Sequence, residues 1–63
     1  MNWRIAKKIL KEVFRAFEED IGPTTKYSIL QLNKAIAINY KHQPKEVKET
    51  ILEIKRMDNQ LII

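Results

Sequence analysis

The sequence contains no cysteine, and it has only one glycine, one histidine and two prolines among its 63 residues. Without cysteine the chain has neither a disulfide to stabilise its fold nor a thiolate to bind a metal or act as a nucleophile. A single histidine cannot by itself form a metal site or a histidine-based catalytic relay. We therefore expect a non-enzymatic protein with no cofactor, no metal site and no small-molecule substrate.

Long hydrophobic runs are also missing. Lys7, Lys8 and Lys11 interrupt the first apolar positions, which argues against a signal peptide or a membrane-spanning helix. We therefore expect a cytoplasmic protein. A chain this short buries a modest fraction of its surface, so its stability must come from apolar packing or from association with another chain. The length predicts one helical domain covering residues 1–63.

The charge balance is basic. Lysine and arginine number 12 against 8 aspartate and glutamate, which gives a formal net charge of +4. A positive charge favours polyanionic partners such as nucleic acid or anionic lipid, although it does not choose between them.

The apolar spacing predicts a first helix over about residues 2–19, ending at Ile21-Gly22-Pro23. Its apolar positions are Trp3, Ala6, Leu10, Val13 and Phe17, widened by Ile5, Ile9 and Phe14. The opposite side carries Arg4, Lys8, Lys11 and Arg15. A Trp-containing apolar face opposite a basic face is also typical of a helix that lies on a membrane surface. We favour core packing for Trp3, Phe14 and Phe17, over membrane or base-stacking roles, because two further apolar segments can cover this face.

Two more helices are expected. The second runs from an N-cap at Thr24 or Thr25 to about Tyr40, either unbroken or split near Asn33. The third starts at Pro44 and ends near residues 58–59, with Asn59 at a positive φ angle. Its buried stripe is Val47, Ile51 and Ile54. The final segment, residues 61–63 (LII), is β-prone and predicts a short C-terminal strand.

The third helix segregates its charges. Lys45, Lys48, Lys55 and Arg56 fall on one exposed side. One interpretation is an ordinary solvated face supported by a Lys45–Glu49 pair. The other is a phosphate-binding face, since lysines that neutralise phosphates release counterions. In the preceding turn, Gln43 is the one amide placed to read a base edge, and His42 is either an exposed turn residue or a phosphate contact.

Three segments carry a resemblance to a known family: residues 32–39 (LNKAIAIN), the buried positions Val47, Ile51 and Ile54, and the final residues 61–63. They are similar to the positioning helix, the recognition helix and the following strand of the winged helix-turn-helix DNA-binding family. The resemblance covers about half the chain and leaves no residues for a full wing. It implies a mainly α, three-helix domain, a reduced winged helix-turn-helix, whose third helix faces DNA.

We therefore expect non-enzymatic binding of double-stranded DNA, as a small transcription regulator. The expected DNA-binding residues are Lys41, His42, Gln43, Lys45, Lys48 and Lys55, with Lys7, Lys8 and Lys11 extending the surface if they face the same way. The alternative is a protein-interaction module or obligate homodimer that assembles through its apolar C-terminus. A membrane surface is a third, less favoured partner.

Overall fold

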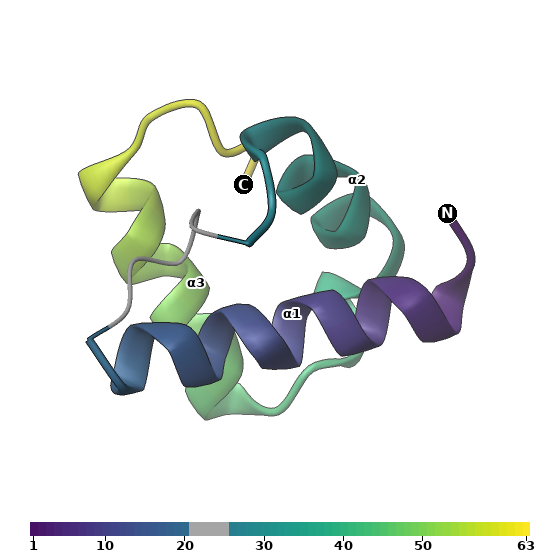
Figure 1. Cartoon of the computed structure of the whole chain (residues 1–63), viewed down its shortest axis with the longest axis horizontal. Coiled ribbons are helices and arrows are strands. Elements are labelled where there is room, and N and C mark those ends of the chain that lie inside the picture. The colour runs from purple at the N-terminus through teal and green to yellow at the C-terminus, as the bar shows by residue number, and fades with distance from the viewer. Residues whose placement is uncertain (21–25) are drawn as a thin grey trace.

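The computed structural model describes residues 1–20 and 26–63. These residues form helices α1 (Trp3–Glu18), α2 (Ile29–Asn39) and α3 (Lys45–Met57), with a short 3₁₀ turn, η1 (Tyr40–His42), between α2 and α3. Figure 1 shows α1 passing in front of α3, α2 above the N-terminal part of α1, and the C-terminal segment returning from α3 towards α2. The predicted mainly α, three-helix domain is confirmed. None of the described helices has the length and apolar content needed to cross a membrane.

Helix α1 is closed at both ends by polar side chains or backbone turns. The Asn2 side chain accepts a hydrogen bond of 2.8 Å from the Ile5 amide, which caps the N-terminus. After Glu18 the helix ends, and Asp20 takes a left-handed φ of 61°, a conformation that Asp tolerates better than most residues. The predicted stop at residues 21–23 lies outside the described residues.

Helix α2 begins later than the sequence predicted. Ser28 is its N-cap: the Gln31 amide donates to Ser28 Oγ over 3.2 Å, and the Ser28 amide donates to Gln31 Oε1 over 3.0 Å. This reciprocal capping box satisfies two amides at once, which a lone threonine hydroxyl does not. The described helix therefore begins at Ile29, and the predicted caps Thr24 and Thr25 lie outside the described residues.

The middle of α2 holds the C-terminal segment in place. Asn33 Nδ2 donates to the Gln60 carbonyl over 2.9 Å, and the Ile62 amide donates to Asn33 Oδ1 over 3.0 Å. The helix is continuous at Asn33, so the alternative of two shorter pieces is wrong. The described residues contain no strand, and the predicted C-terminal strand is wrong, because this segment bonds to a side chain rather than to another strand.

Helix α3 has about the predicted bounds, but it ends in a different way from the prediction. It begins at Lys45, directly after Pro44, and its last residue is Met57. Asp58 ends it in an extended conformation, and in the described ranges Asp20 is the one non-glycine residue with positive φ, so the prediction for Asn59 is wrong.

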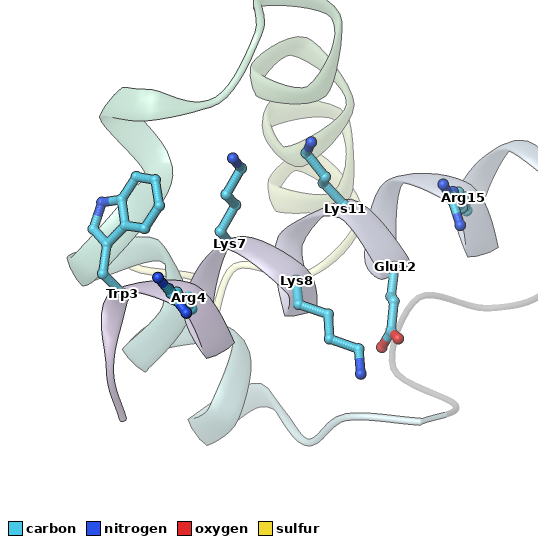
Figure 2. Close-up of a pocket in the computed structure, with 7 residues that line it drawn as sticks. All are labelled: Trp3, Arg4, Lys7, Lys8, Lys11, Glu12 and Arg15. Atoms are coloured by element: carbon cyan, nitrogen blue, oxygen red, sulfur yellow. The ribbon is translucent and has the colours of Figure 1, made fainter.

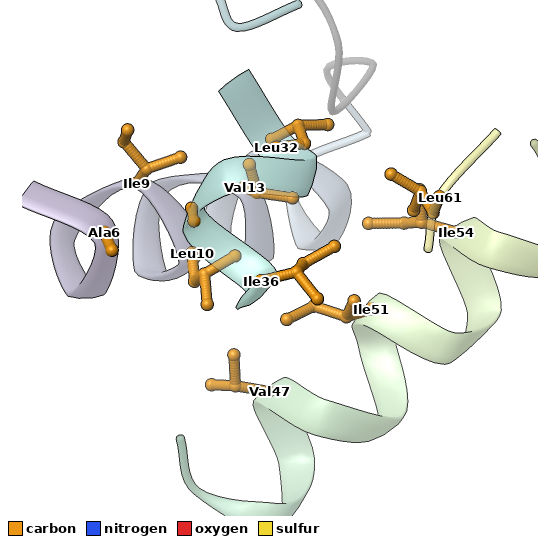
Figure 3. Close-up of a cluster of buried hydrophobic side chains, with 11 residues drawn as sticks. Ala6, Ile9, Leu10, Val13, Leu32, Ile36, Val47, Ile51, Ile54 and Leu61 are labelled. Atoms are coloured by element: carbon orange, nitrogen blue, oxygen red, sulfur yellow. The ribbon is translucent and has the colours of Figure 1, made fainter. Parts of the chain in front are cut away.

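The core lies between the three helices and the C-terminal segment (Figure 3). Its buried side chains are Ala6, Ile9, Leu10, Val13, Leu32, Ala35, Ile36, Val47, Ile51, Ile54 and Leu61. The predicted stripe of α3 is confirmed, and Phe14 and Phe17 pack against the core while partly exposed. Trp3 was predicted in the core, and this is wrong, because its side chain is 44% exposed and contacts polar neighbours on the surface.

Candidate nucleic-acid interface

A shallow basic groove of about 430 Å³ runs along the exposed side of α1. It is lined by Trp3, Arg4, Lys7, Lys8, Lys11, Glu12 and Arg15. Figure 2 shows Lys7 and Lys11 leaning to one edge of the exposed face of α1, Lys8 and Glu12 leaning to its other edge, and Trp3 and Arg15 at opposite ends. We call these seven residues the basic groove. Five of them carry positive charge and one is a carboxylate, so the groove is strongly cationic.

The helix itself places these cations together. Ala6, Ile9, Leu10 and Val13 are buried, so the opposite side of α1 must face solvent. Positions 4, 8, 11 and 15 recur at spacings of four, three and four on that side. At 1.5 Å per residue, Arg4 and Arg15 are separated by about 16 Å along the axis. This length equals the rise of about five nucleotides of one DNA strand.

An exposed aromatic side chain closes the N-terminal end of the groove. The indole of Trp3 meets the imidazole of His42 edge to face, with ring centroids 5.8 Å apart. The Lys7 ammonium lies over the same indole, 5.2 Å from its centroid, a cation–π arrangement. These two contacts link the groove to η1, the turn that the sequence singled out.

Gln43 holds that turn against α1. Its Nε2 donates to Asn39 Oδ1 over 2.6 Å and, more weakly, to the Lys7 carbonyl over 3.4 Å. The Gln43 side chain is buried, so it cannot read a base edge while the fold is intact, and that prediction is wrong. Lys41 and His42 are both exposed in the same turn, next to the groove.

The carboxylate of the groove is already engaged. Glu12 accepts a hydrogen bond from the Tyr27 hydroxyl and lies 3.4 Å from Lys26 Nζ. The Tyr27 hydrogen bond is the main cause that lowers the pKa of Glu12 below its ordinary value. Burial acts in the opposite direction, and weaker attraction to Lys26 and Lys8 adds to the lowering. The same hydrogen bond raises the pKa of Tyr27. Glu12 therefore stays ionised but is compensated by Lys26, and the groove cations remain available.

The lysines predicted on α3 do not form a comparable surface. Lys45 lies 3.8 Å from Glu49, and Arg56 lies 3.1 Å from Glu53. Lys55 donates to the carbonyls of Asn59 and Leu61, at the C-terminal end of the helix. Lys48, the other lysine predicted to bind DNA on α3, is half-buried.

One flank of α3 is acidic. Together with the end of α1 it lines a hollow of about 310 Å³. The lining residues are Phe14, Phe17, Glu18, Glu46, Glu49, Thr50 and Glu53. This flank would repel phosphates, whereas the basic groove would attract them.

Sequence reasoning found part of this site. The charge pattern shows the basic side of the first helix, but it predicts the main surface on the third helix, with the first helix as an extension. The exposure of Trp3 and the burial of Gln43 were missed. The burial of Gln43 follows from its hydrogen bonds to Asn39 and to the Lys7 carbonyl across η1, which the spacing within one helix does not reveal.

The described ranges, 1–20 and 26–63, contain no group of three His, Asp or Glu side chains placed to hold a metal ion. Comparison with known protein families, with curated proteins and with solved structures gave no match. The resemblance to the winged helix-turn-helix family therefore stays a prediction, and the function has to be argued from the surface itself.

Proposed function

We propose that this protein is a non-enzymatic nucleic-acid-binding protein that holds the sugar-phosphate backbone in the basic groove of α1. The observation that carries the proposal is the concentration of five cations on one groove in a chain whose formal net charge is +4. Phosphate neutralisation and counterion release supply most of the affinity of such surfaces. His42, which contacts Trp3, and Lys41, which is exposed in the same turn, extend the surface across the turn.

The proposal keeps the ligand class expected from the sequence and moves the contact from the third helix to the first. On α3, ion pairs with glutamates offset the charges of Lys45 and Arg56. Double-stranded DNA therefore remains a ligand to test, bound by its backbone rather than by a recognition helix. Base reading, a regulatory role and a cytoplasmic location are predictions that this surface does not depend on.

Two double variants test where the contact lies. Arg4→Glu with Lys11→Glu removes two groove cations, and Lys45→Glu with Lys48→Glu removes the two best candidates on α3. Each pair of substitutions lowers the formal net charge from +4 to zero. The two variants therefore have the same net charge and differ in the position of the substituted residues. All four side chains lie outside the hydrophobic core, and circular dichroism checks that both variants fold.

Binding is measured by fluorescence anisotropy with a labelled duplex and a labelled single strand, each about 15 nucleotides long. With about four phosphates neutralised, affinity for the duplex should fall roughly a hundredfold between about 50 and about 200 mM salt. The α1 pair should weaken binding about tenfold or more and make the salt slope shallower by about two. The α3 pair should weaken it much less.

Each other result has a definite meaning. Equal losses in both variants would show that net charge alone matters and that the groove is not the contact. A larger loss of affinity in the α3 double variant than in the α1 double variant would place the interface on the third helix. Absence of binding to either oligonucleotide at low salt would remove the nucleic-acid function altogether.

A further inference from the structure

We infer that the basic groove takes single-stranded nucleic acid in preference to duplex, with one unpaired base stacked on Trp3. The inference rests on the proposed function and adds to it the form of the ligand. It starts from the position of Trp3, a large aromatic side chain left 44% exposed at the end of a cationic groove. Cations that follow the backbone, combined with an aromatic that stacks on bases, are what sequence-independent single-strand binding requires.

The indole is held in position before any ligand arrives. The edge-to-face contact with His42, at 5.8 Å between centroids, fixes the orientation of the ring. His42 is held in turn because Gln43, the next residue, is buried and hydrogen-bonded to Asn39 and to the Lys7 carbonyl. The ordering of the aromatic surface is therefore part of the fold and does not have to be supplied by the ligand.

Lys7 is placed to exchange partners when a strand binds. Its ammonium now lies over the Trp3 ring at 5.2 Å. A base that stacks on the indole takes the place of this ammonium, which moves on its flexible side chain to the neighbouring phosphate. The cation–π contact is thus replaced by one stacking contact and one phosphate contact, both with the same nucleotide.

A duplex cannot use this arrangement, because its bases are already stacked and their faces are hidden. Trp3 could meet only the edge or the backbone of a duplex, which leaves its contribution unused. The lysines and arginines of the basic groove do not distinguish single strand from duplex, since both present phosphates. The difference between the two ligands therefore depends on Trp3, and Trp3 variants should measure it.

An anionic membrane offers the same phosphate chemistry, and the arrangement of the apolar residues speaks against it. Trp3 and Ile5 are both exposed. They are two positions apart in the helix, so their side chains point about 200° apart and do not form one face that could insert into a membrane. The continuous apolar face of α1, centred on Ala6, Leu10 and Val13, is buried inside the protein. A helix bound at a membrane surface needs that face free.

The experiment compares three polyanions: a single-stranded oligonucleotide, a hairpin duplex and inorganic polyphosphate, which carries the charge without bases. Trp3→Leu removes the stacking surface, Trp3→Phe keeps an aromatic ring, and Ile5→Ala is the matched control at the exposed position on the other side of the helix. Because Trp3 is the one tryptophan in the sequence, its fluorescence reports directly on the site in the unaltered protein.

We expect tighter binding to the single strand than to the hairpin, with Trp3 fluorescence quenched by the single strand and unchanged by polyphosphate. Trp3→Leu should weaken single-strand binding about tenfold, the effect of losing one stacked base, and leave polyphosphate binding within about twofold. Trp3→Phe should restore most of the loss, and Ile5→Ala should bind all three ligands like the wild type.

Several outcomes overturn the inference while leaving the proposed function intact. One is a duplex bound as tightly as the single strand, and another is an equal loss for polyphosphate and single strand in Trp3→Leu, which would assign Trp3 a merely structural role. No binding of any polyanion would instead remove the proposed function. A blue shift of Trp3 emission with phosphatidylserine vesicles, lost in Ile5→Ala, together with no oligonucleotide binding, would identify a membrane-surface protein.

Discussion

At the residue scale, the buried amides are the least expected feature of the molecule. Asn39 Nδ2 and Gln43 Oε1 are buried without a hydrogen-bond partner in the part of the chain that the structure describes. Each such atom costs on the order of 1–3 kcal/mol in a folded protein. What the pair achieves is positional: it bonds the turn that carries Lys41 and His42 to α1 at Lys7.

Tyr27 gives a pH-dependent prediction at the same scale. Its hydroxyl donates to Glu12, so Tyr27→Phe should lower the free energy of unfolding by about 1 kcal/mol near neutral pH. The pKa of Glu12 is lowered in the folded protein. The stability that ionised Glu12 contributes is therefore fully present above pH 4.5 and is lost as the pH falls through the lowered pKa. The pKa of Tyr27 is raised, so its share is present below 10.0 and is lost as the pH rises through the raised pKa.

Urea unfolding of the wild type and of Tyr27→Phe across this pH range measures the difference directly. The difference in unfolding free energy between the two proteins should be largest at pH values between the titrations of Glu12 and Tyr27, and it should become smaller at more acidic and more alkaline pH. A difference that stays constant from acid to alkaline pH would mean that the hydrogen bond to Glu12 does not contribute, and that only packing of the ring was altered.

At the element scale, the start of α2 depends on Ser28 and Gln31 rather than on the threonines further upstream. Ser28→Ala removes the hydroxyl that accepts from the Gln31 amide, and it should lower stability by about 1 kcal/mol. Ser28→Asp keeps an acceptor at the N-cap and should restore most of this loss. Thermal unfolding followed by circular dichroism compares the three proteins. Equal melting temperatures for Ser28→Ala and the wild type would show that α2 is held by packing alone.

The helices also differ in how they use charge. In α1 the cations occupy one groove with one carboxylate, which Tyr27 and Lys26 already engage. In α3 lysine and arginine alternate with glutamates that pair with them three or four residues away. Counting basic residues along the chain does not separate these two cases, because the pairing depends on which side of each helix faces solvent.

At the scale of the whole molecule, the core is closed within a single chain. Among residues 1–20 and 26–63, eleven buried hydrophobic side chains come from all three helices and from the C-terminal segment, where Leu61 is buried. The apolar C-terminus, which motivated the homodimer hypothesis, is therefore partly used inside the protein. Ile62 and Ile63 are its exposed remainder.

We accordingly expect a monomer of 7.5 kDa in sedimentation experiments at concentrations of tens of micromolar or below. The matched variant is Ile62→Ser with Ile63→Ser, which keeps Leu61 in the core and the backbone bond from Ile62 to Asn33. A dimer of the wild type that dissociates in this variant would contradict the expectation and support assembly through the C-terminus. A dimer that persists in the variant would place the interface elsewhere.

The sequence by itself determined the number and order of the helices and the approximate bounds of the first and third, because apolar spacing and the position of Pro44 are local properties. It also showed that one side of the first helix is basic. The tertiary structure decided that glutamates pair with Lys45 and Arg56 on α3, that Trp3 is exposed, that Gln43 is buried and that the C-terminal segment bonds to Asn33. These are contacts between residues far apart in the sequence, and periodicity within one helix carries no information about the neighbours that cover it.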